Sequence, residues 1–289
     1  MGFVLYKWNT FCYQPFSNQQ LYIMKFIHFI LILCWVENPV FSQPKSIEIP
    51  FDNTTSPSSP YVRGEVLKYR VHYGWIDAGE AVLTITNEKK KIKGRDTYHM
   101  VGTGRSLGAF NWFFKVRDRY ETYIDEYEYV PLVFIRRVNE GGYIINQDQE
   151  FDHQMKTVNS NGNNFDIPSG VQDMLSAFYY ARKLDFSTAK VGDEFIITTF
   201  LDDEIFPLKI KYAGKETIKN EMGKFPCRKF HPVVQEGRVF NADKDLSVWI
   251  SDDNNSIPIR IEAKLFVGSA KMDLKHYEGL AHPIALIHK

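Results

Sequence analysis

The sequence predicts a mainly β protein, built as a large, strongly bent antiparallel sheet or barrel-like roll with one substantial helix at about residues 170–183. Three observations support this prediction. Apolar and polar residues alternate over much of the chain from Tyr61 onward, which is the period of a strand with one buried face. Only one substantial segment has helical periodicity, and no regular βαβ rhythm indicates a parallel sheet. An antiparallel sheet of about a dozen strands has to curl, close or split in two.

The first 42 residues are expected to lie outside the folded domain. Met24-Lys25 precedes an apolar run from Phe26 to Val36, and Val40-Phe41-Ser42 ends the segment ahead of Gln43. A basic start, a short apolar core and small residues near the cleavage point are typical of a secretory signal peptide. A short hydrophobic anchor or a core helix is the alternative, since a membrane span needs about 20 residues. We expect translation to start at Met24, which makes residues 1–23 a spurious extension.

Charge and cysteine content narrow the function classes. Residues 1–42 hold two of the 35 basic and one of the 35 acidic side chains, so the remainder has a net charge of −1. Such a nearly neutral net charge does not indicate a nucleic-acid-binding protein, which would carry an excess of basic residues. Cys34 is a weak candidate for lipidation because the large Leu33 precedes it. Cys227 then remains alone in the domain, where we expect a buried apolar residue rather than a reactive thiol.

The domain itself is predicted to span 61–289, after a Pro/Ser/Thr-rich flexible leader at 43–60. Its first element is a hairpin. Apolar residues alternate from Leu67 to Tyr73, and the alternation resumes from Ala81 to Ile85 after a connector bounded by Gly74 and Gly79.

Further strands follow the hairpin. They are expected at 97–103, 114–124, 132–139, 143–151, 195–201, 208–212, 246–250 and 257–267, the last two joined as a hairpin through 252–255. The helix should begin at Ser169-Gly-Val-Gln172, which has the spacing of a capping box. Val171, Met174, Leu175 and Phe178 continue it as one apolar stripe.

Asp118 is the residue that departs most from the alternation of apolar and polar residues in its strand. It is in phase with Val116 and Tyr120, so it points toward the apolar face, where a carboxylate is costly unless it is paired. One interpretation is a site carboxylate that lines a cavity. The other is a structural acid held by Arg136 or Arg137.

Aromatic residues are the second candidate feature. The chain has 22 Phe, 16 Tyr and 5 Trp, and Gly108 to Phe114 concentrates four of them. Most should fill the core, but some could line an apolar pocket. The ligand-binding candidates taken from both features are Tyr73, Trp75, Trp112, Phe113 and Asp118.

Motifs for catalysis, metals and cofactors are lacking. The histidines have no zinc-site spacing, and no CxxC or nucleophile elbow occurs. Gly102-Thr-Gly-Arg-Ser106 lacks the ending of a phosphate loop. We therefore expect no cofactor, no metal and no catalytic residue.

Several segments together resemble an exported bacterial family, domain of unknown function 3108, in a form similar to members from the Bacteroidetes. They are Gly64 to Ala81, Val116-Arg-Asp-Arg-Tyr120, Val171 to Arg182, Val248 to Asp253 and Ile257-Pro-Ile-Arg260. The resemblance covers roughly residues 61–280 and implies a β-rich envelope protein without agreed catalytic residues. Its bent sheet is similar to that of periplasmic lipoprotein carriers, whose concave face holds acyl chains.

These observations favour a non-enzymatic protein of the periplasm or outer membrane, with no transmembrane span. It would bind an apolar, lipid-like or peptide ligand, a lipoprotein or another envelope partner on the concave face of its sheet. Two alternatives stay open. One is a hydrolase of envelope polymers in which Asp118 is one of two carboxylates. The other is a purely structural scaffold.

Overall fold

The computed structural model describes residues 47–48, 59–232, 246–264 and 268–287. The predicted signal peptide, the start at Met24 and Cys34 lie outside these residues. The described strands are β1 (Ile47–Glu48), β2 (Val66–Tyr73), β3 (Ile76–Ile85), β4 (Lys90–Ile92), β5 (Arg95–Ser106), β6 (Arg117–Asp125), β7 (Pro131–Glu140), β8 (Tyr143–Asp152), β9 (Thr157–Ser160), β10 (Asn163–Asp166), β11 (Glu194–Leu201), β12 (Glu204–Asn220), β13 (Gly223–Pro232), β14 (Leu246–Ser251), β15 (Pro258–Lys264) and β16 (Ser269–Glu278). The described helices are α2 (Phe110–Phe113) and α3 (Met174–Ala181).

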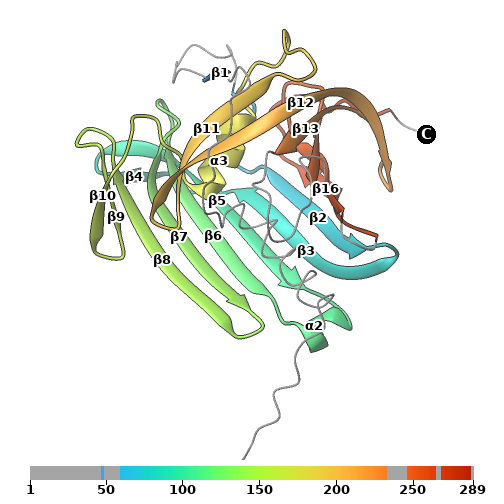
Figure 1. Ribbon diagram of the computed structural model, residues 1–289, viewed down its shortest axis with the longest axis horizontal. Helices are drawn as coiled ribbons and strands as arrows, with labels where there is room; N and C mark the ends of the chain where they lie inside the picture. Colours follow the sequence, from blue (N-terminus) through green and yellow to red (C-terminus); the bar gives the residue numbers. More distant parts are fainter. Residues whose placement is uncertain (1–46, 49–58, 233–245, 265–267, 288–289) are drawn as a thin grey trace, which may run out of the picture.

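All of these strands belong to one open, bent sheet, which confirms the predicted fold class (Figure 1). Its order is β1-β11-β12-β13-β14-β15-β16-β2-β3-β5-β6-β7-β8-β9-β10, with β4 attached to β5. Each pairing in the described part is antiparallel except that of β1 with β11. β1 lies within the segment that we predicted as a flexible leader. The predicted hairpins β2–β3 and β14–β15 are both present.

Bulges give the sheet much of its curvature. The register shifts once within each of five strand pairs, and an extra residue in one strand increases the local twist and bend. The long strand β12 shifts between Tyr212 and Gly214, where Gly214 has a φ of +104°. The other shifts lie at Val71/His72, Tyr123/Ile124, Trp249/Ile250 and Leu274/His276.

Helix α3 begins later and is shorter than the sequence predicted. Its N-cap is Asp173, whose carboxylate accepts from the amides of Leu175 and Ser176, while the Ser176 hydroxyl accepts from the Asp173 amide. The predicted cap at Ser169 is wrong. The reason is competition by β11: the Gln172 amide donates to Thr198 and the Gln172 carbonyl accepts from Phe200, so residue 172 pairs with a strand.

Side chains of the concave face pack against one another and against α3, which lies between β11 and β5 in Figure 1. One buried cluster joins β5–β8 to the helix through Met100, Phe134, Phe151, Leu175 and Tyr179. A second cluster fills the space between β2, β16 and the β12–β13 hairpin, and a third lies between α3 and β11–β13. The concave face of the described chain is therefore occupied largely by its own residues.

A buried ion pair links the end of α3 to the start of β2. The guanidinium of Arg182 contacts both carboxylate oxygens of Glu65, at 2.6 and 2.8 Å, and both side chains are almost inaccessible. Arg182 also donates to the carbonyls of Asn255 and Pro60. All three nitrogen atoms of this guanidinium are therefore hydrogen-bonded, which fixes the position of the C-terminal end of α3 relative to the sheet.

Candidate functional site

Three turns at one end of the sheet expose large apolar side chains. The β2–β3 turn presents Trp75, which is 88% exposed, and Ile76 follows at 42%. The β5–β6 connection presents Trp112 of α2, which is 82% exposed. The β7–β8 turn presents Tyr143 and Ile144, which are 59% and 60% exposed. We call these five residues the aromatic rim.

The rim residues share one end because turns of an antiparallel sheet alternate between its two ends. Backbone hydrogen bonds join the three turns. The Leu107 amide donates to the Ala78 carbonyl at 3.0 Å, and the Gly141 amide donates to the Lys115 carbonyl at 2.9 Å. Val116 and Glu140 form a bridge between the second and third turns. Both α2 and the β7–β8 turn lie along the lower edge of Figure 1.

A glycine in the β7–β8 turn allows this turn to pack closely against Phe114. Gly141 has a φ of +57°, and a Cβ at this position would lie 2.2 Å from the ring of Phe114. Because only glycine leaves that space empty, the chain can turn directly over the aromatic ring. The ring and the turn together support the residues of the aromatic rim on either side.

The five sequence-predicted candidates do not converge on one pocket. Trp75 and Trp112 belong to the aromatic rim, and partly buried Tyr73 ends β2 beside it, with its hydroxyl near Gly268. Phe113 is the last residue of α2, and its side chain lies outside the described structure. Asp118 is 4% exposed and lies on the inner face of β6, among the polar side chains behind the rim.

Asp118 forms a carboxyl pair with Glu140, which is also 4% exposed. Burial raises the pKa of Asp118 to about 8, and the charge and hydrogen bond of Glu140 add to this effect. The Asn139 amide, which donates to Oδ1 of Asp118 at 3.0 Å, and the charge of Arg136 both oppose the rise. Asp118 is therefore protonated at neutral pH.

The two arginines proposed as partners of Asp118 have different roles. Arg136 lies on the same inner face and is 1% exposed, but its guanidinium binds Asp202 of the β11–β12 turn at 2.6 Å. In that turn Asp203 also accepts a hydrogen bond, from Gln147 at 3.2 Å. Arg137 lies on the outer face and binds Asp148 at 2.7 Å.

The carboxyl pair does not have the geometry of a glycoside hydrolase. Such enzymes hold two carboxyl groups about 5–9.5 Å apart across an accessible cleft. Here the two carboxyl groups are hydrogen-bonded to each other and buried. The pair can hold a proton inside the sheet, but a polymer chain has no room between its members.

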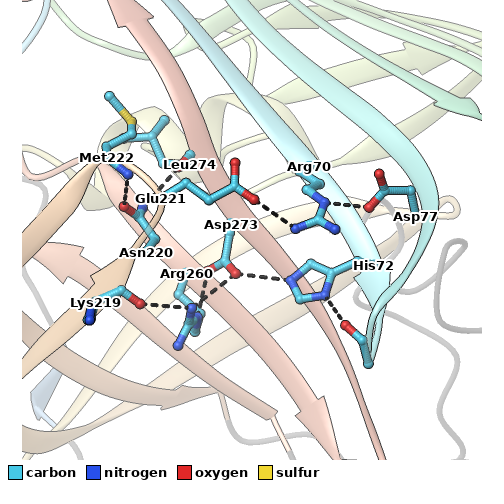
Figure 2. A network of polar contacts seen from close by, with 11 residues as sticks. Arg70, His72, Asp77, Lys219, Asn220, Glu221, Met222, Arg260, Asp273 and Leu274 are labelled. Atoms are coloured by element: carbon cyan, nitrogen blue, oxygen red, sulfur yellow. Dashed lines mark hydrogen bonds and ion pairs between the residues drawn. The ribbon is translucent and has the colours of Figure 1, made fainter.

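Charged residues form a second feature, shown in Figure 2, between β2, β16 and the β12–β13 turn. They surround a cavity of about 350 Å³, which we call the charged cleft. Its lining residues are Arg70, His72, Lys219, Asn220, Glu221, Asp273, Leu274 and Lys275. Arg70 contacts both Asp77 and Glu221, and Arg260 holds Asp273 through two hydrogen bonds.

His72 is the centre of that network. Its Nε2 lies 3.0 Å from Asp273 and its Nδ1 lies 2.8 Å from the Gly74 carbonyl oxygen. Because a carbonyl oxygen and a carboxylate both accept, the two ring nitrogens both donate and the ring is an imidazolium. The hydrogen bond to Asp273 accordingly raises the pKa of His72. The lining contains no serine, threonine or cysteine for this pair to activate as a nucleophile.

Cys227 is buried, as the sequence predicted, and burial raises its pKa to about 12. Within the described residues, no three histidine, cysteine or acidic side chains are grouped so that they could hold a metal ion. The described helices also include none that is long and apolar enough to cross a bilayer.

Comparison with known proteins identifies the family. A family model described as "Protein of unknown function (DUF3108)" matches residues 68–275. The chain belongs to this DUF3108 family. The match confirms the resemblance seen in the sequence. The search of curated proteins gives no match.

One solved structure reaches a TM-score of 0.50 against this DUF3108 chain, and others match it at lower scores. A beta-barrel-like protein of domain of unknown function DUF1849 from Brucella abortus has a TM-score of 0.50 at 10% identity, and the match covers 75% of this chain and 98% of that one. A predicted lipoprotein from Parabacteroides distasonis has a TM-score of 0.32 at 12% identity, with 76% and 97% covered. A predicted exported protein with a YmcC-like fold from Bacteroides fragilis has a TM-score of 0.30 at 12% identity, with 76% and 97% covered.

Sequence reasoning missed two parts of the site. Glu140 is in the same strand phase as Leu132, Phe134 and Arg136, so continuing the count by twos would have placed it inward. Tyr143 and Ile144 directly follow Gly141-Gly142, and that position in a turn is the available signal for their exposure.

Proposed function

We propose that this DUF3108 protein is an exported, non-catalytic protein of the cell envelope that binds an apolar partner through the aromatic rim. The observation that carries the proposal is the exposure of five large apolar side chains, two of them tryptophans, on three adjoining turns. Large apolar side chains that are exposed together on adjoining turns favour an interaction surface. The candidates Tyr73, Trp75 and Trp112 all lie at or beside this surface.

The packing of the sheet favours the rim over the concave face as the binding surface. The concave face carries three buried clusters and is covered by α3 and the β11–β12 hairpin. Asp118 belongs to the polar layer behind the rim and has 4% of its surface exposed, so we assign it to support rather than to ligand contact.

Export is supported by the leader pattern. Met24-Lys25, the apolar run from Phe26 to Val36 and the small residues up to Ser42 together have the arrangement of a signal peptide. The periplasm and the outer membrane are both compartments in which such a chain would meet apolar partners.

The absence of an enzyme activity is supported by the chemistry of the polar groups. The carboxyl pair is closed by its own hydrogen bond, and the His72–Asp273 pair is tied to Gly74 and Arg260. The carboxyl pair is inaccessible to a substrate, and both ring nitrogens of His72 are engaged within the fold, so neither arrangement is placed to transfer a proton to a substrate.

Photo-cross-linking in the native cells tests the proposal. A photoreactive phenylalanine analogue placed at Trp75 should give adducts with envelope components, and the same analogue at Tyr127 serves as the control. Tyr127 is 76% exposed and lies at the opposite end of the sheet. Equal yields at both positions, or recovery of the protein in the cytoplasmic fraction with its leader intact, would contradict the proposal.

A further inference from the structure

We propose that the partner of the aromatic rim is the surface of a phospholipid bilayer, with Trp75 and Trp112 inserted among the headgroups. This inference rests on the proposed function, because it takes the rim as the contact surface. It commits to a lipid surface as the occupant, and a protein partner is one outcome of the test below.

The chemistry of the rim fits a membrane interface. Tryptophan and tyrosine are enriched at headgroup depth, where an apolar ring and a polar N–H or O–H are satisfied together. The rim offers Trp75, Trp112 and Tyr143 for that layer, and Ile76 and Ile144 add apolar surface beside them. All five lie in the connections at this end of the sheet or in the first residues of the strands that follow them.

The exposure of both tryptophans favours a fluid partner. Trp75 and Trp112 expose more than four fifths of their area each, so most of each side chain is accessible to a partner. A bilayer can close around such side chains without a preformed complement, whereas a folded protein partner would need a matching pocket for each ring.

Charge near the rim is complementary to anionic headgroups. Lys115 and Arg117 are exposed beside α2, and neither has a carboxylate partner in the described part of the chain. The nearby acids are already neutralised: Asp77 binds Arg70, and Glu80 binds Arg105 at 2.9 Å. A basic surface next to interfacial aromatic residues is attracted to an anionic leaflet.

The opposite end of the sheet provides a contrast. It also exposes apolar side chains, since Tyr127 is 76% and Met155 is 72% exposed. Glu126 and Glu128 are paired with Arg63 and Arg95, and the exposed lysines of that end include Lys89, Lys90 and Lys156. Charge alone therefore does not separate the two ends, and the feature particular to the rim is its pair of tryptophans on adjoining turns.

Vesicle flotation with matched variants tests the inference. The protein purified from its own cells is mixed with vesicles of phosphatidylethanolamine and phosphatidylglycerol, and with vesicles of phosphatidylcholine alone. The wild type should float with the anionic vesicles, and salt should weaken binding. The double variant Trp75→Ser, Trp112→Ser should bind about tenfold less or weaker still, because two large rings are lost from the interface. The control double variant Tyr127→Ser, Met155→Ser should bind like the wild type.

A second measurement reports the position of the rim directly. Brominated phospholipids quench the fluorescence of tryptophans that enter the bilayer. In the wild type they should quench most of the emission that comes from Trp75 and Trp112. This part of the emission is the difference between the wild type and the double variant Trp75→Phe, Trp112→Phe. Trp249 is 5% exposed, and its unchanged emission reports that each variant is folded. Equal flotation of the wild type and the serine variant, together with unquenched rim fluorescence, would overturn the inference.

The two proposals fail in different ways. If the vesicle assays are negative while the cross-linker at Trp75 still captures an envelope protein, the partner is a protein and only the bilayer inference is wrong. If neither assay gives a signal at the rim, the proposed function is wrong as well.

Discussion

Replacing Asp118 by asparagine should make the protein more stable at neutral pH. The Asp118 carboxyl has a pKa of about 8 in the folded chain, compared with 3.8 for a free side chain. Between these values the folded state keeps a proton that the unfolded state has released. The free energy of unfolding therefore falls as pH rises, by about 1.4 kcal/mol per pH unit. From pH 4 to pH 7 the loss amounts to about 4 kcal/mol as an upper value.

Asparagine removes this dependence without changing the shape of the side chain. Its Oδ1 can still accept from the Asn139 amide, and its NH₂ group can donate to Glu140 in place of the Asp118 proton. The two proteins should have similar stability near pH 4, and the variant should be the more stable one above it. The difference should stop growing once the pH passes the folded pKa.

Urea denaturation followed by circular dichroism at a series of pH values measures this difference. Asp148→Asn is the matched control, because Asp148 is 59% exposed on the outer face of β8 and binds Arg137. Its effect should be about 1 kcal/mol or less at every pH. Parallel stability curves for the wild type and Asp118→Asn, or a variant that is less stable at pH 7, would refute the carboxyl pair as described.

Two further predictions concern the same end of the sheet. Gly141→Ala should lower the free energy of unfolding by about 2 kcal/mol more than Gly74→Ala, as measured by thermal unfolding. The two glycines have nearly equal φ values of +57° and +56°, but only Gly141 faces an aromatic ring. Equal losses of stability in the two variants would contradict this prediction. His72→Gln should destabilise the protein by about 1 kcal/mol near pH 5 and by less near pH 8, because a raised folded pKa gives stability at low pH that is lost as pH rises through it. A larger loss at pH 8 than at pH 5 in the same urea titrations would show that His72 is neutral in the fold.

The alternation of apolar and polar residues predicted the strands well because it follows from the backbone geometry of each single strand. Leu67 and Tyr69 are fully buried where the period of two placed them, and Asp118 points inward as its phase required. The partner of Asp118 could not be read in the same way. Its pairing with Glu140 depends on the register of β6 against β7, which includes a bulge between Tyr123 and Ile124. A single strand does not contain that information.

The start of the helix and the exposure of the tryptophans could not be predicted, for different reasons. Helical periodicity from Val171 was real, but hydrogen bonds to β11 hold residue 172 in a strand-like pairing and delay the helix until Met174. Trp75 and Trp112 were proposed for a concave pocket because aromatic content alone does not report exposure. Only the positions of the turns place both side chains in solvent.

The adjacency of β2 and β16 has a consequence for how the chain reaches this structure. The first long strand and the last one are hydrogen-bonded neighbours in the middle of the sheet, with Leu67 opposite Tyr277. Contacts between such distant segments are slow to form, because a long loop has to close first. The central pairing of the sheet is therefore missing until the C-terminal strand has emerged, and a nascent or truncated chain presents two unpaired β edges, at β2 and at β15.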